Sequence, residues 1–283
     1  MPAPADRSPS RRRFLRASGG LAAALGLSGC VVSTQPYTET SDREFDPGNA
    51  EALAVQTDSG DVSLSATSGG VVSGTVRKES RSGRDALDQV TVEGNVEDGT
   101  LTIAPQRPDE RVNVTVSLDL SVPEDLPVVE VASENGDVNA DGVAGDGTYR
   151  TDNGDIEVRS VDGFVAVEST NGDVSASDVA GLDGALTSNG DVTVDVPALR
   201  GDATCRSNNG DVTAAVPEDL GAAVSLRTSN GDAETSGVSL TVDESTEHRI
   251  EGVLGGSEGG ESAEHTLELR STNGDVTLLG LGE

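Results

Sequence analysis

Apolar and polar side chains alternate along most of the chain, in short runs that a fixed tripeptide interrupts at regular intervals. Successive copies of Asn-Gly-Asp are separated by 18, 18, 18, 20, 21 and 43 residues. On each side of the tripeptide, apolar residues stand two positions apart, which is the period of a strand with one buried face. The pattern therefore predicts two short strands per repeat, joined by a turn in which Gly permits a positive φ. The copies begin at Asn135, Asn153, Asn171, Asn189, Asn209, Asn230 and Asn273.

Other positions of the repeat also keep one chemical character. Two residues before the Asn stands a hydroxylic residue in every copy, and four before it stands a core-forming one. Such strict columns favour a single-stranded β-helix, in which each coil stacks on the previous one about 4.8 Å away. An antiparallel meander with Asn-Gly hairpins is the alternative. In a β-helix we expect the Asn side chains to form an internal amide ladder, with a hydroxyl ladder beside it.

The repeats divide the chain into four parts. Residues 1–29 are predicted to be a signal peptide, residues 30–50 a polar tether, residues 51–130 an irregular N-terminal β cap with early coils, and residues 131–283 the repeats, with a flexible loop at residues 251–264. Because the last spacing is about two repeats long, we expect it to contain a degenerate or loop-bearing copy. The loop at residues 251–264 is then expected to precede the final coil, which contains Asn273. The predicted fold is an all-β solenoid with coils of about 18–21 residues.

The first thirty residues carry two address motifs. The segment Ser10–Arg16, with Arg11 and Arg12, resembles a twin-arginine export signal, and the segment Leu27–Cys30 resembles a lipoprotein processing box. The apolar stretch between them is too short to span a bilayer as a helix. The resemblance implies cleavage before Cys30, a lipid on its thiol, and a location on the extracellular face of the cell membrane. A cytosolic protein with a basic N-terminal tail is the alternative.

The charge balance is extreme. The chain has 50 acidic and 19 basic side chains, a formal net charge of −31, and Lys78 is its only lysine. A surface of this kind repels nucleic acid and anionic lipid. It favours a protein adapted to molar salt, where screening within a few ångström removes most of the self-repulsion, and hence a halophilic source.

Few residues offer reactive chemistry. If Cys30 carries lipid, Cys205 has no partner for an intrachain disulfide, and we expect a buried thiol rather than a reactive one. His248 and His265 lack ligand-spaced neighbours for zinc, and no histidine accompanies a serine or cysteine motif as a base. We therefore expect no enzyme and no cofactor. Asn113-Val114-Thr115 is a glycosylation sequon, with Asn113 expected to face outward.

The acidic residue that ends each tripeptide is the most suggestive column. Stacked carboxylates about 4.8 Å apart repel one another, and Ca²⁺ or Mg²⁺ could bridge them weakly. The simpler interpretation is that each Asp accepts N–H groups of the turn and solvates the surface. This candidate cation stripe consists of Asp137, Asp155, Asp173, Asp191, Asp211, Asp232 and Asp275.

Repeated Asn-Gly-Asp-Val units, Val-Pro-Glu-Asp-Leu at residues 122–126 and again at 216–220, and a closing Ser-Thr-Asn-Gly-Asp-Val at residues 271–276 together resemble the putative-adhesin β-strand-repeat family of surface proteins. The resemblance covers roughly residues 51–280. It implies the β-repeat fold and a cell-surface location, and it supplies no catalytic residues.

We therefore predict a lipid-anchored, non-catalytic cell-surface β-repeat protein with a structural or adhesin-like role. Its expected partners are the membrane, through the anchor, and a surface glycan, the surface layer or another envelope protein, but not nucleic acid. The alternative is an envelope lipoprotein that binds a protein partner or regulates a membrane complex.

Overall fold

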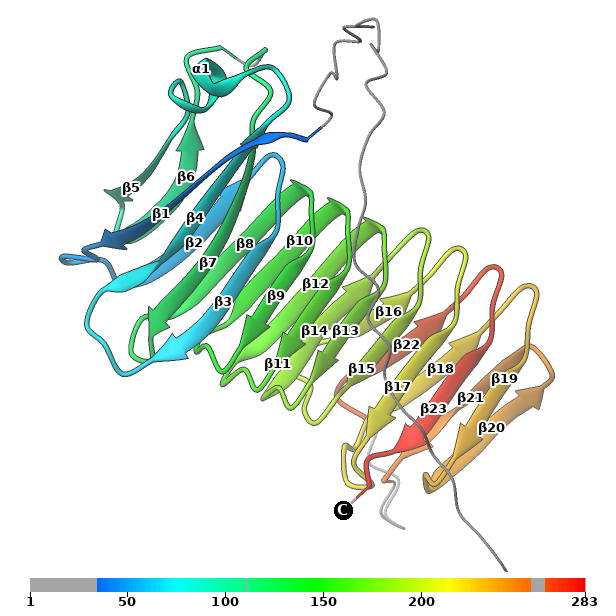
Figure 1. The fold of residues 1–283 in the computed structure, drawn as a ribbon. Helices are drawn as coiled ribbons and strands as arrows, with labels where there is room; N and C mark the ends of the chain where they lie inside the picture. The colour runs from blue at the N-terminus through cyan, green and yellow to red at the C-terminus, as the bar shows by residue number, and fades with distance from the viewer. Residues whose placement is uncertain (1–34, 110, 256–262, 283) are drawn as a thin grey trace, which may run out of the picture. The chain divides into compact units, whose positions relative to one another are not determined.

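The computed structural model describes residues 35–109, 111–255 and 263–282. Within them, two β-sheets enclose a common apolar core (Figure 1). A four-residue helix, α1 (Arg84–Leu87), follows β4, and across the described residues no helix is long and apolar enough to cross a bilayer. The 11-stranded sheet has the spatial order β1 (Tyr37–Phe45), β4 (Val72–Ser80), β7 (Thr115–Pro123), β3 (Val62–Thr67), β9 (Val138–Asp141), β11 (Ile156–Arg159), β13 (Val174–Ser177), β15 (Val192–Asp195), β17 (Val212–Val216), β23 (Val276–Gly280) and β19 (Ala233–Ser236). The 12-stranded sheet has the order β20 (Leu240–Thr246), β21 (Arg249–Leu254), β18 (Ala223–Arg227), β22 (Thr266–Arg270), β16 (Ala203–Arg206), β14 (Gly181–Leu186), β12 (Phe164–Asn171), β10 (Gly147–Asn153), β8 (Val128–Asn135), β2 (Ala52–Thr57), β6 (Thr100–Gln106) and β5 (Thr91–Glu97).

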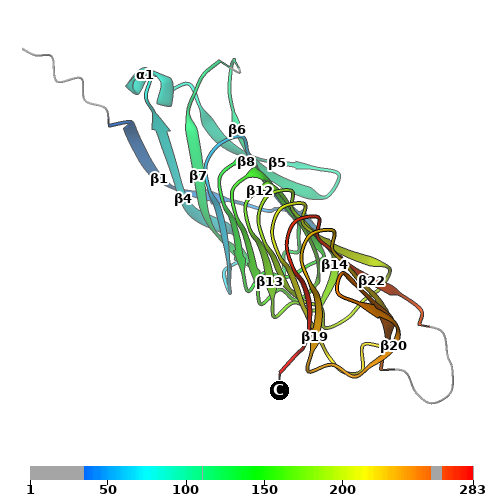
Figure 2. The same cartoon turned by 90° about the vertical axis from the view of Figure 1, so that its right-hand side faces the viewer.

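Each repeat contributes one strand to each sheet. A strand of the 12-stranded sheet leads into the Asn-Gly-Asp turn, and the next strand joins the 11-stranded sheet, so that the turns lie one behind another (Figure 2). Equivalent strands pair in parallel, with Asn153 opposite Asn135 and also opposite Asn171. This pairing excludes an antiparallel meander for the repeats. It confirms the prediction of an all-β chain with parallel-stranded sheets.

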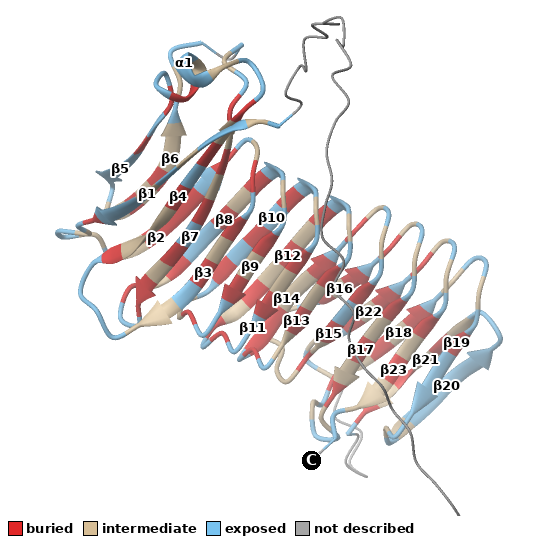
Figure 3. Ribbon diagram, in the orientation of Figure 1, coloured by how far each residue is buried: buried red, intermediate tan, exposed pale blue. Residues whose placement is uncertain are grey.

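The core lies between the sheets and follows the predicted columns. Buried positions form rows that cross the strands (Figure 3). On the strand before the turn, Val131, Tyr149 and Val167 are at most 1% exposed, and after the turn Val138 and Ile156 are equally buried. Burying one such side chain stabilises the fold by about 1.5–3 kcal/mol, so the summed rows hold the two sheets together.

The spatial order of the coils departs from the chain order at both ends. Strands β22 and β23 pair with β16 and β17 on one side and with β18 and β19 on the other. The Asn273 repeat is thus inserted between the Asn209 and Asn230 repeats, and the expectation that it is the final coil is wrong. At the other end, β2 and β3 lie between β6–β7 and β8–β9.

The physical reason for the C-terminal insertion lies in the core column. The Asn230 repeat has Thr235 at a position where the Asn273 repeat has Leu278. Leu278 is fully buried between two coils, whereas Thr235 is exposed. The antiparallel strands β20 and β21 extend the 12-stranded sheet beyond β18, and the chain then returns to place β22 inside the sheet. A polar residue therefore lies at the open end and a large apolar one inside.

The tether predicted for residues 30–50 contains a strand, because residues 37–45 form β1. This strand pairs antiparallel with β4 over its nine residues, although only Phe45 is buried. An edge strand with charged side chains has a polar composition like that of a linker. The only lysine of the chain secures this region. Lys78 is buried, its Nζ donates to the carbonyl oxygens of Leu87 (3.0 Å) and Val90 (3.2 Å), and it lies 2.9 Å from Glu39 Oε1.

The predicted loop at residues 251–264 is wrong at its beginning. Residues 251–254 belong to β21, which pairs with both β18 and β20. The strand was not predicted because the segment is rich in Gly, Ser and Glu, although Ile250 and Leu254 on this strand are buried. A Cβ at Gly252 would come within 2.4 Å of the Thr241 carbonyl oxygen, so glycine suits the close approach of the two strands. Residues 256–262 of the predicted loop lie outside the described residues.

Candidate functional site

The Asn side chains form a continuous amide ladder along one corner of the coils. Each Nδ2 except that of Asn135 donates to the Oδ1 of the Asn in the neighbouring coil at 2.9–3.0 Å, and Asn135 Nδ2 donates to the Asp58 carbonyl oxygen at 3.2 Å. The ladder is exposed, so the expectation of an internal position is wrong. The reason is that the chain turns between Ser133 and Val138, which both point into the core, and this leaves Asn135 outside. In space the ladder runs through Asn135, Asn153, Asn171, Asn189, Asn209, Asn273 and Asn230.

The hydroxylic column lies beneath this ladder, but its members do not bond to one another as expected. Each hydroxyl donates instead to the carbonyl oxygen of the turn glycine in the neighbouring coil. Thr151 Oγ1 bonds to Gly136 at 2.8 Å, and Ser207 Oγ bonds to Gly190 at 2.7 Å. Thr151 and Ser207 are at most 1% exposed. Since a buried carbonyl without a partner costs about 1–3 kcal/mol, the hydroxyl column satisfies a polar atom that each turn places at the core boundary.

The turn glycines are required by close approach as well as by conformation. Gly154 has φ +154°, and a Cβ there would lie 2.2 Å from the carbonyl oxygen of Gly136. The same restriction recurs in the other coils; a Cβ at Gly231, for example, would lie 2.3 Å from the carbonyl oxygen of Gly274. Side chains larger than hydrogen therefore cannot occupy this column without moving the backbone.

The Asp carboxylates also connect adjacent coils. Asp137 Oδ1 accepts the backbone N–H of Asp155 at 2.9 Å, and Asp155 Oδ1 accepts that of Asp173 at 2.8 Å. The contact recurs through Asp191, Asp211, Asp275 and Asp232. Thus one oxygen of each accepting carboxylate is used in coil stacking. No group of three or more His, Cys, Asp or Glu residues in the described part of the chain is arranged to hold a metal ion, and the cation stripe stays a prediction.

The two ends of the ladder are completed by other residues. At the N-terminal end, Ser117 Oγ accepts the N–H of Asp61 at 3.2 Å, and the Val116 carbonyl accepts the hydroxyl of Thr57 at 3.0 Å. At the C-terminal end, His248 Nδ1 lies 2.7 Å from the Gly231 carbonyl oxygen, where a neighbouring coil would supply a hydroxyl. The turn between β20 and β21 therefore supplies the hydrogen bond to Gly231 that a further coil would otherwise supply.

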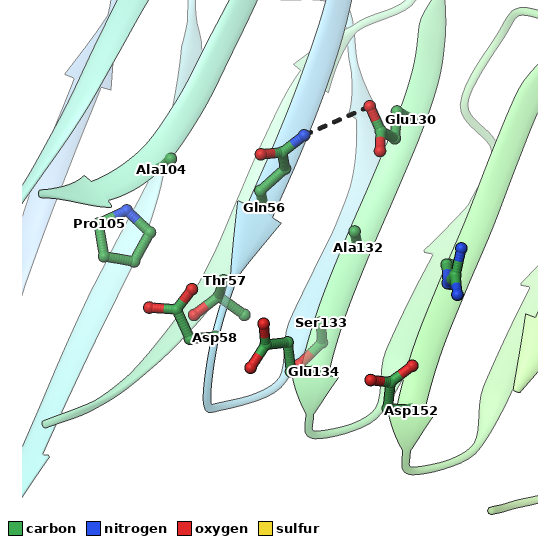
Figure 4. A pocket seen from close by; sticks show the side chains of 11 residues that line it. Gln56, Thr57, Asp58, Ala104, Pro105, Glu130, Ala132, Ser133, Glu134 and Asp152 are labelled. Atoms are coloured by element: carbon green, nitrogen blue, oxygen red, sulfur yellow. Dashed lines mark hydrogen bonds between the residues drawn. The ribbon is translucent and has the colours of Figure 1, made fainter. Parts of the chain in front are cut away.

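A concave, mainly polar surface lies on the outer face of the 12-stranded sheet, near the N-terminal coils (Figure 4). It encloses a volume of about 480 Å³. Gln56 Nε2 donates to Glu130 Oε2 across it at 3.3 Å, and Arg107 forms an ion pair with Asp58 beside it. We call it the acidic groove, lined by Gln56, Thr57, Asp58, Ala104, Pro105, Glu130, Ala132, Ser133, Glu134, Arg150 and Asp152.

The acidic groove has little capacity for nucleophilic catalysis. Its two hydroxyl groups are already used, because Thr57 donates to Val116 and Ser133 donates to the Gly60 carbonyl oxygen at 3.0 Å. Its lining contains neither histidine nor cysteine nor lysine that could act as nucleophile or base. The groove can instead accept hydrogen bonds and hold cationic groups of a partner.

A family model described as Toastrack DUF4097 matches residues 46–279. The chain belongs to the Toastrack DUF4097 family. No curated protein matches it. Solved structures similar to this Toastrack chain include a putative cell adhesion protein from Clostridium sporogenes ATCC 15579, with 12% identity, a TM-score of 0.37, and coverage of 87% of this chain and 100% of the other. A putative adhesin from Bacteroides fragilis NCTC 9343 has 14% identity, a TM-score of 0.30, and coverage of 87% and 99%.

The structure also shows the surroundings of the cysteine, the sequon asparagine and the histidines noted in the sequence of this Toastrack chain. Cys205 is completely buried, and burial raises the pKa of its thiol to about 12. Burial likewise raises the pKa of Tyr149, whose hydroxyl has no hydrogen-bond partner among the described residues. Asn113 is exposed, as expected, just before β7. Of the two histidines, only His248 forms a side-chain contact at the end of the ladder among the described residues. Arg11, Arg12 and Cys30 lie outside the described residues.

Sequence reasoning missed an inter-coil contact on the opposite corner of the Toastrack coils. Arg200 Nε donates to Asp183 Oδ1 at 2.8 Å, its guanidinium also pairs with Asp146, and it lies 4.6 Å above the Phe164 ring. Asp146 accepts the N–H of Phe164 at 2.8 Å, and this bond together with Arg200 lowers the pKa of Asp146. A signal was present, because Asp202 stands in the same column as Asp146 and accepts the N–H of Thr266.

Proposed function

We propose that this chain is a lipid-anchored cell-surface protein with a structural or adhesin-like, non-catalytic role. The observation that carries the proposal is the use of the repeated polar residues. Asn, Asp and Ser/Thr side chains bond to the neighbouring coil in one repeat after another. Repetition therefore serves the stiffness of the stack rather than a reaction centre, as expected of a scaffold that presents a surface.

The outward-facing side chains of the sheets are free to serve recognition. On the 12-stranded sheet, the position three before each Asn is occupied by residues as different as Ala132, Arg150, Glu168 and Leu186. Such variation on a constant backbone is typical of a surface whose function lies in its side chains. The export and lipidation motifs of residues 1–30 favour presentation of this surface outside the cell, toward a glycan, the surface layer or another envelope protein.

The acidic groove favours the alternative function, an envelope lipoprotein that binds a protein partner or regulates a membrane complex. Its carboxylates, Asp58, Glu130, Glu134 and Asp152, suit a basic segment of such a partner. This candidate differs from the first in requiring one defined partner rather than a surface polymer.

Attachment of cells of the source organism separates the two. A deletion strain is compared with strains that express the wild type or the Cys30→Ser variant, with the amount of protein measured in each. The proposal predicts that deletion reduces attachment and aggregation, and that only the anchored wild type restores them. Equal attachment of all strains would contradict an adhesive role, and cross-linking at the acidic groove would then be used to identify an envelope partner.

A further inference from the structure

All four Lys or Arg residues of the last 83 residues come together on the outer face of the 12-stranded sheet. Arg206 lies opposite Arg270 on β22, Arg270 lies opposite Arg227 on β18, and Arg227 lies opposite Arg249 on β21. In the chain they are 21, 22 and 21 residues apart. The insertion of β22 between β16 and β18 makes the row continuous. We call it the arginine row, and it comprises Arg206, Arg270, Arg227 and Arg249.

The row is accessible and only partly neutralised. Arg206, Arg227 and Arg270 are exposed, and the Arg249 side chain is 40% exposed. Arg227 and Arg249 share Glu251, both at 2.6 Å, and Arg249 also lies 3.4 Å from Glu244. Arg206 donates to the neutral Asn208 side chain at 2.8 Å. Within the described residues, neither Arg206 nor Arg270 has an ion-pair partner. The two guanidinium groups on adjacent strands therefore remain available to an external anion.

Folding alone does not account for this row. Like charges directly opposite on neighbouring strands destabilise a sheet. The same column holds Ala132, Glu168 and Leu186 in other coils, so a strand here does not require arginine. The chain as a whole is strongly acidic, with a net charge of −31, and four adjacent arginines are opposite to that bias. Glu251 offsets this cost for Arg227 and Arg249, but the juxtaposition of Arg206 and Arg270 on adjacent strands has no such compensation in the described part of the chain and indicates a role in binding.

We propose that the arginine row binds a linear anionic polysaccharide of the cell surface, through the carboxylates or sulfates along its chain. This inference rests on the proposed surface function and names the partner. Four strands set side by side place the guanidinium groups along about 14 Å, a length suited to a polymer rather than to a single small anion. Each planar guanidinium can hold a carboxylate or sulfate through two parallel hydrogen bonds.

The rows on either side of the arginines differ in character. In the row away from the Asn-Gly-Asp turns, Thr204 lies opposite Glu268, Glu268 opposite Ser225, and Ser225 opposite Glu251, so hydroxyls alternate with carboxylates. On the turn side, Asn208, Ser229 and Thr272 follow the arginines by two residues, and Asn208 bonds to Arg206. The neutral hydroxyl and amide groups on the turn side can donate to and accept from a polysaccharide, while the guanidinium groups bind its charges.

An acidic peptide fits the same surface less well. Strands β16, β22 and β18 are interior strands, paired on both sides, so a peptide cannot add to the sheet through backbone hydrogen bonds there. The net charge of the chain repels any polyanion at long range, so binding must rest on direct contacts with the arginine row. In molar salt the Debye length is only about 3 Å, so long-range interaction is lost, but a guanidinium in direct contact with a carboxylate or sulfate is screened much less.

The test uses the purified full-length protein and immobilised polymers, at low and at molar salt. Polygalacturonate and dextran sulfate present carboxylates and sulfates, neutral dextran is the uncharged control, and polyglutamate presents peptide carboxylates. The row variant combines Arg206→Gln, Arg227→Gln and Arg270→Gln. The control variant combines Arg43→Gln, Arg77→Gln and Arg159→Gln, which removes the same charge elsewhere on the exposed surface. Thermal unfolding shows that both variants fold.

We expect the wild type and the control variant to bind at least one anionic polysaccharide, and the row variant to bind it about 100-fold more weakly. Whether polygalacturonate or dextran sulfate is retained identifies the anion. Equal affinity of the row and control variants would overturn the proposal, as would a wild type that binds neither polysaccharide. Preferential retention on polyglutamate would also overturn it, in favour of an acidic peptide. If the row variant does not fold, a variant with Lys at the same three positions takes its place, with weaker binding expected because Lys lacks the paired donors.

Cell attachment separates failure of this proposal from failure of the proposed function. If the deletion strain loses attachment but the row variant restores it fully, the arginine row is not the binding surface, although the surface role stands. If the deletion strain attaches normally while the purified protein binds a polysaccharide through the row, the assignment of the arginine row as a binding surface is supported and the adhesive role is contradicted.

Discussion

The two ends of the coil stack are built alike in topology and differently in chemistry. At each end, one coil is inserted between two others: β2–β3 at the N-terminal end and β22–β23 at the C-terminal end. At the N-terminal end, antiparallel β4 and β1 continue the 11-stranded sheet, whereas at the C-terminal end that sheet stops at the four-residue β19. The 12-stranded sheet continues there through β21 and β20.

The two ends also offer different hydrogen-bonding groups, because the side-chain hydrogen bonds that the Asn, Ser/Thr and Asp columns form between coils all run in one direction. Each coil donates from its Asn amide, its Ser or Thr hydroxyl and its Asp N–H to the coil on its N-terminal side in space. The N-terminal end must therefore offer acceptors, which the Val116 carbonyl and Ser117 Oγ provide. The C-terminal end must offer donors, and His248 supplies one to Gly231. A stack of identical coils thus needs two different ends, because the side-chain hydrogen bonds of these columns all point in the same direction along the stack.

The largest expected effect comes from interrupting the stack between its ends. In Gly154→Ala, the new Cβ would lie 2.2 Å from the Gly136 carbonyl oxygen, at a φ of +154° that disfavours alanine. We expect a loss of about 4 kcal/mol in the free energy of unfolding, measured by urea denaturation at fixed salt. Gly201→Ala is the matched control, because its Cβ would meet no atom within 4 Å. Equal stability of the two variants would contradict the close approach of the turns.

The next test concerns which coil is interior. Leu278→Ala removes a fully buried side chain from the inserted coil and should lower the free energy of unfolding by about 2–5 kcal/mol. Thr235→Ala changes the equivalent, exposed position of the spatially last coil, and should change it by less than about 0.5 kcal/mol. If the coils were stacked in chain order, Leu278 would lie in the last coil and its replacement would cost much less, so urea denaturation of this pair decides the order.

A smaller effect is expected along the amide ladder. Asn171→Ala removes the bonds donated to Asn153 (2.9 Å) and to the Asp152 carbonyl oxygen (3.3 Å), and the bond accepted from Asn189 (2.9 Å). Asn230→Ala, at the spatial end of the ladder, removes the bonds donated to Asn273 (3.0 Å) and to the Thr272 carbonyl oxygen (3.2 Å). At about 0.5–1.5 kcal/mol for each exposed bond, the first variant should lose about one and a half times as much stability as the second in urea denaturation. Equal losses would show that the ladder contributes little beyond the turn itself.

The smallest expected effect is at the C-terminal closure. His248→Ala removes the donor to the Gly231 carbonyl and should cost about 1 kcal/mol in the free energy of unfolding. Hydrogen exchange should rise first in the segment between β20 and β21, because that segment loses its side-chain bond to the turn, while the backbone bonds from Thr228 and Ala233 to it remain. His265→Ala serves as the control histidine and should leave both readouts unchanged. An identical exchange pattern in the two variants would argue against a closing role for His248.

The repeat itself could be predicted in detail. The seven Asn-Gly-Asp turns, the hydroxyl column and the core columns all reappear as aligned positions of parallel strands. The errors concern the surroundings of the repeat, the order of its coils and the place of its amide and hydroxyl ladders. Strand β1 was not predicted because only one of its nine residues is buried, and an edge strand needs no apolar face. The amide ladder was placed inside because the columns alone do not show where the chain turns outward.

The sequence by itself determined the local unit: two short strands, a glycine turn, and alternate residues facing a core, because strand periodicity and turn conformation are properties of neighbouring residues. Only the tertiary structure decided which coil lies beside which. Leu278 and Thr235 contained the signal, but its meaning appeared only with the insertion of β22 and β23 between earlier coils. The same insertion brings Arg206, Arg270, Arg227 and Arg249 into one row. Parallel coils with equivalent backbones can be stacked in any order, so their order depends on long-range fit of side chains at the ends rather than on local pattern.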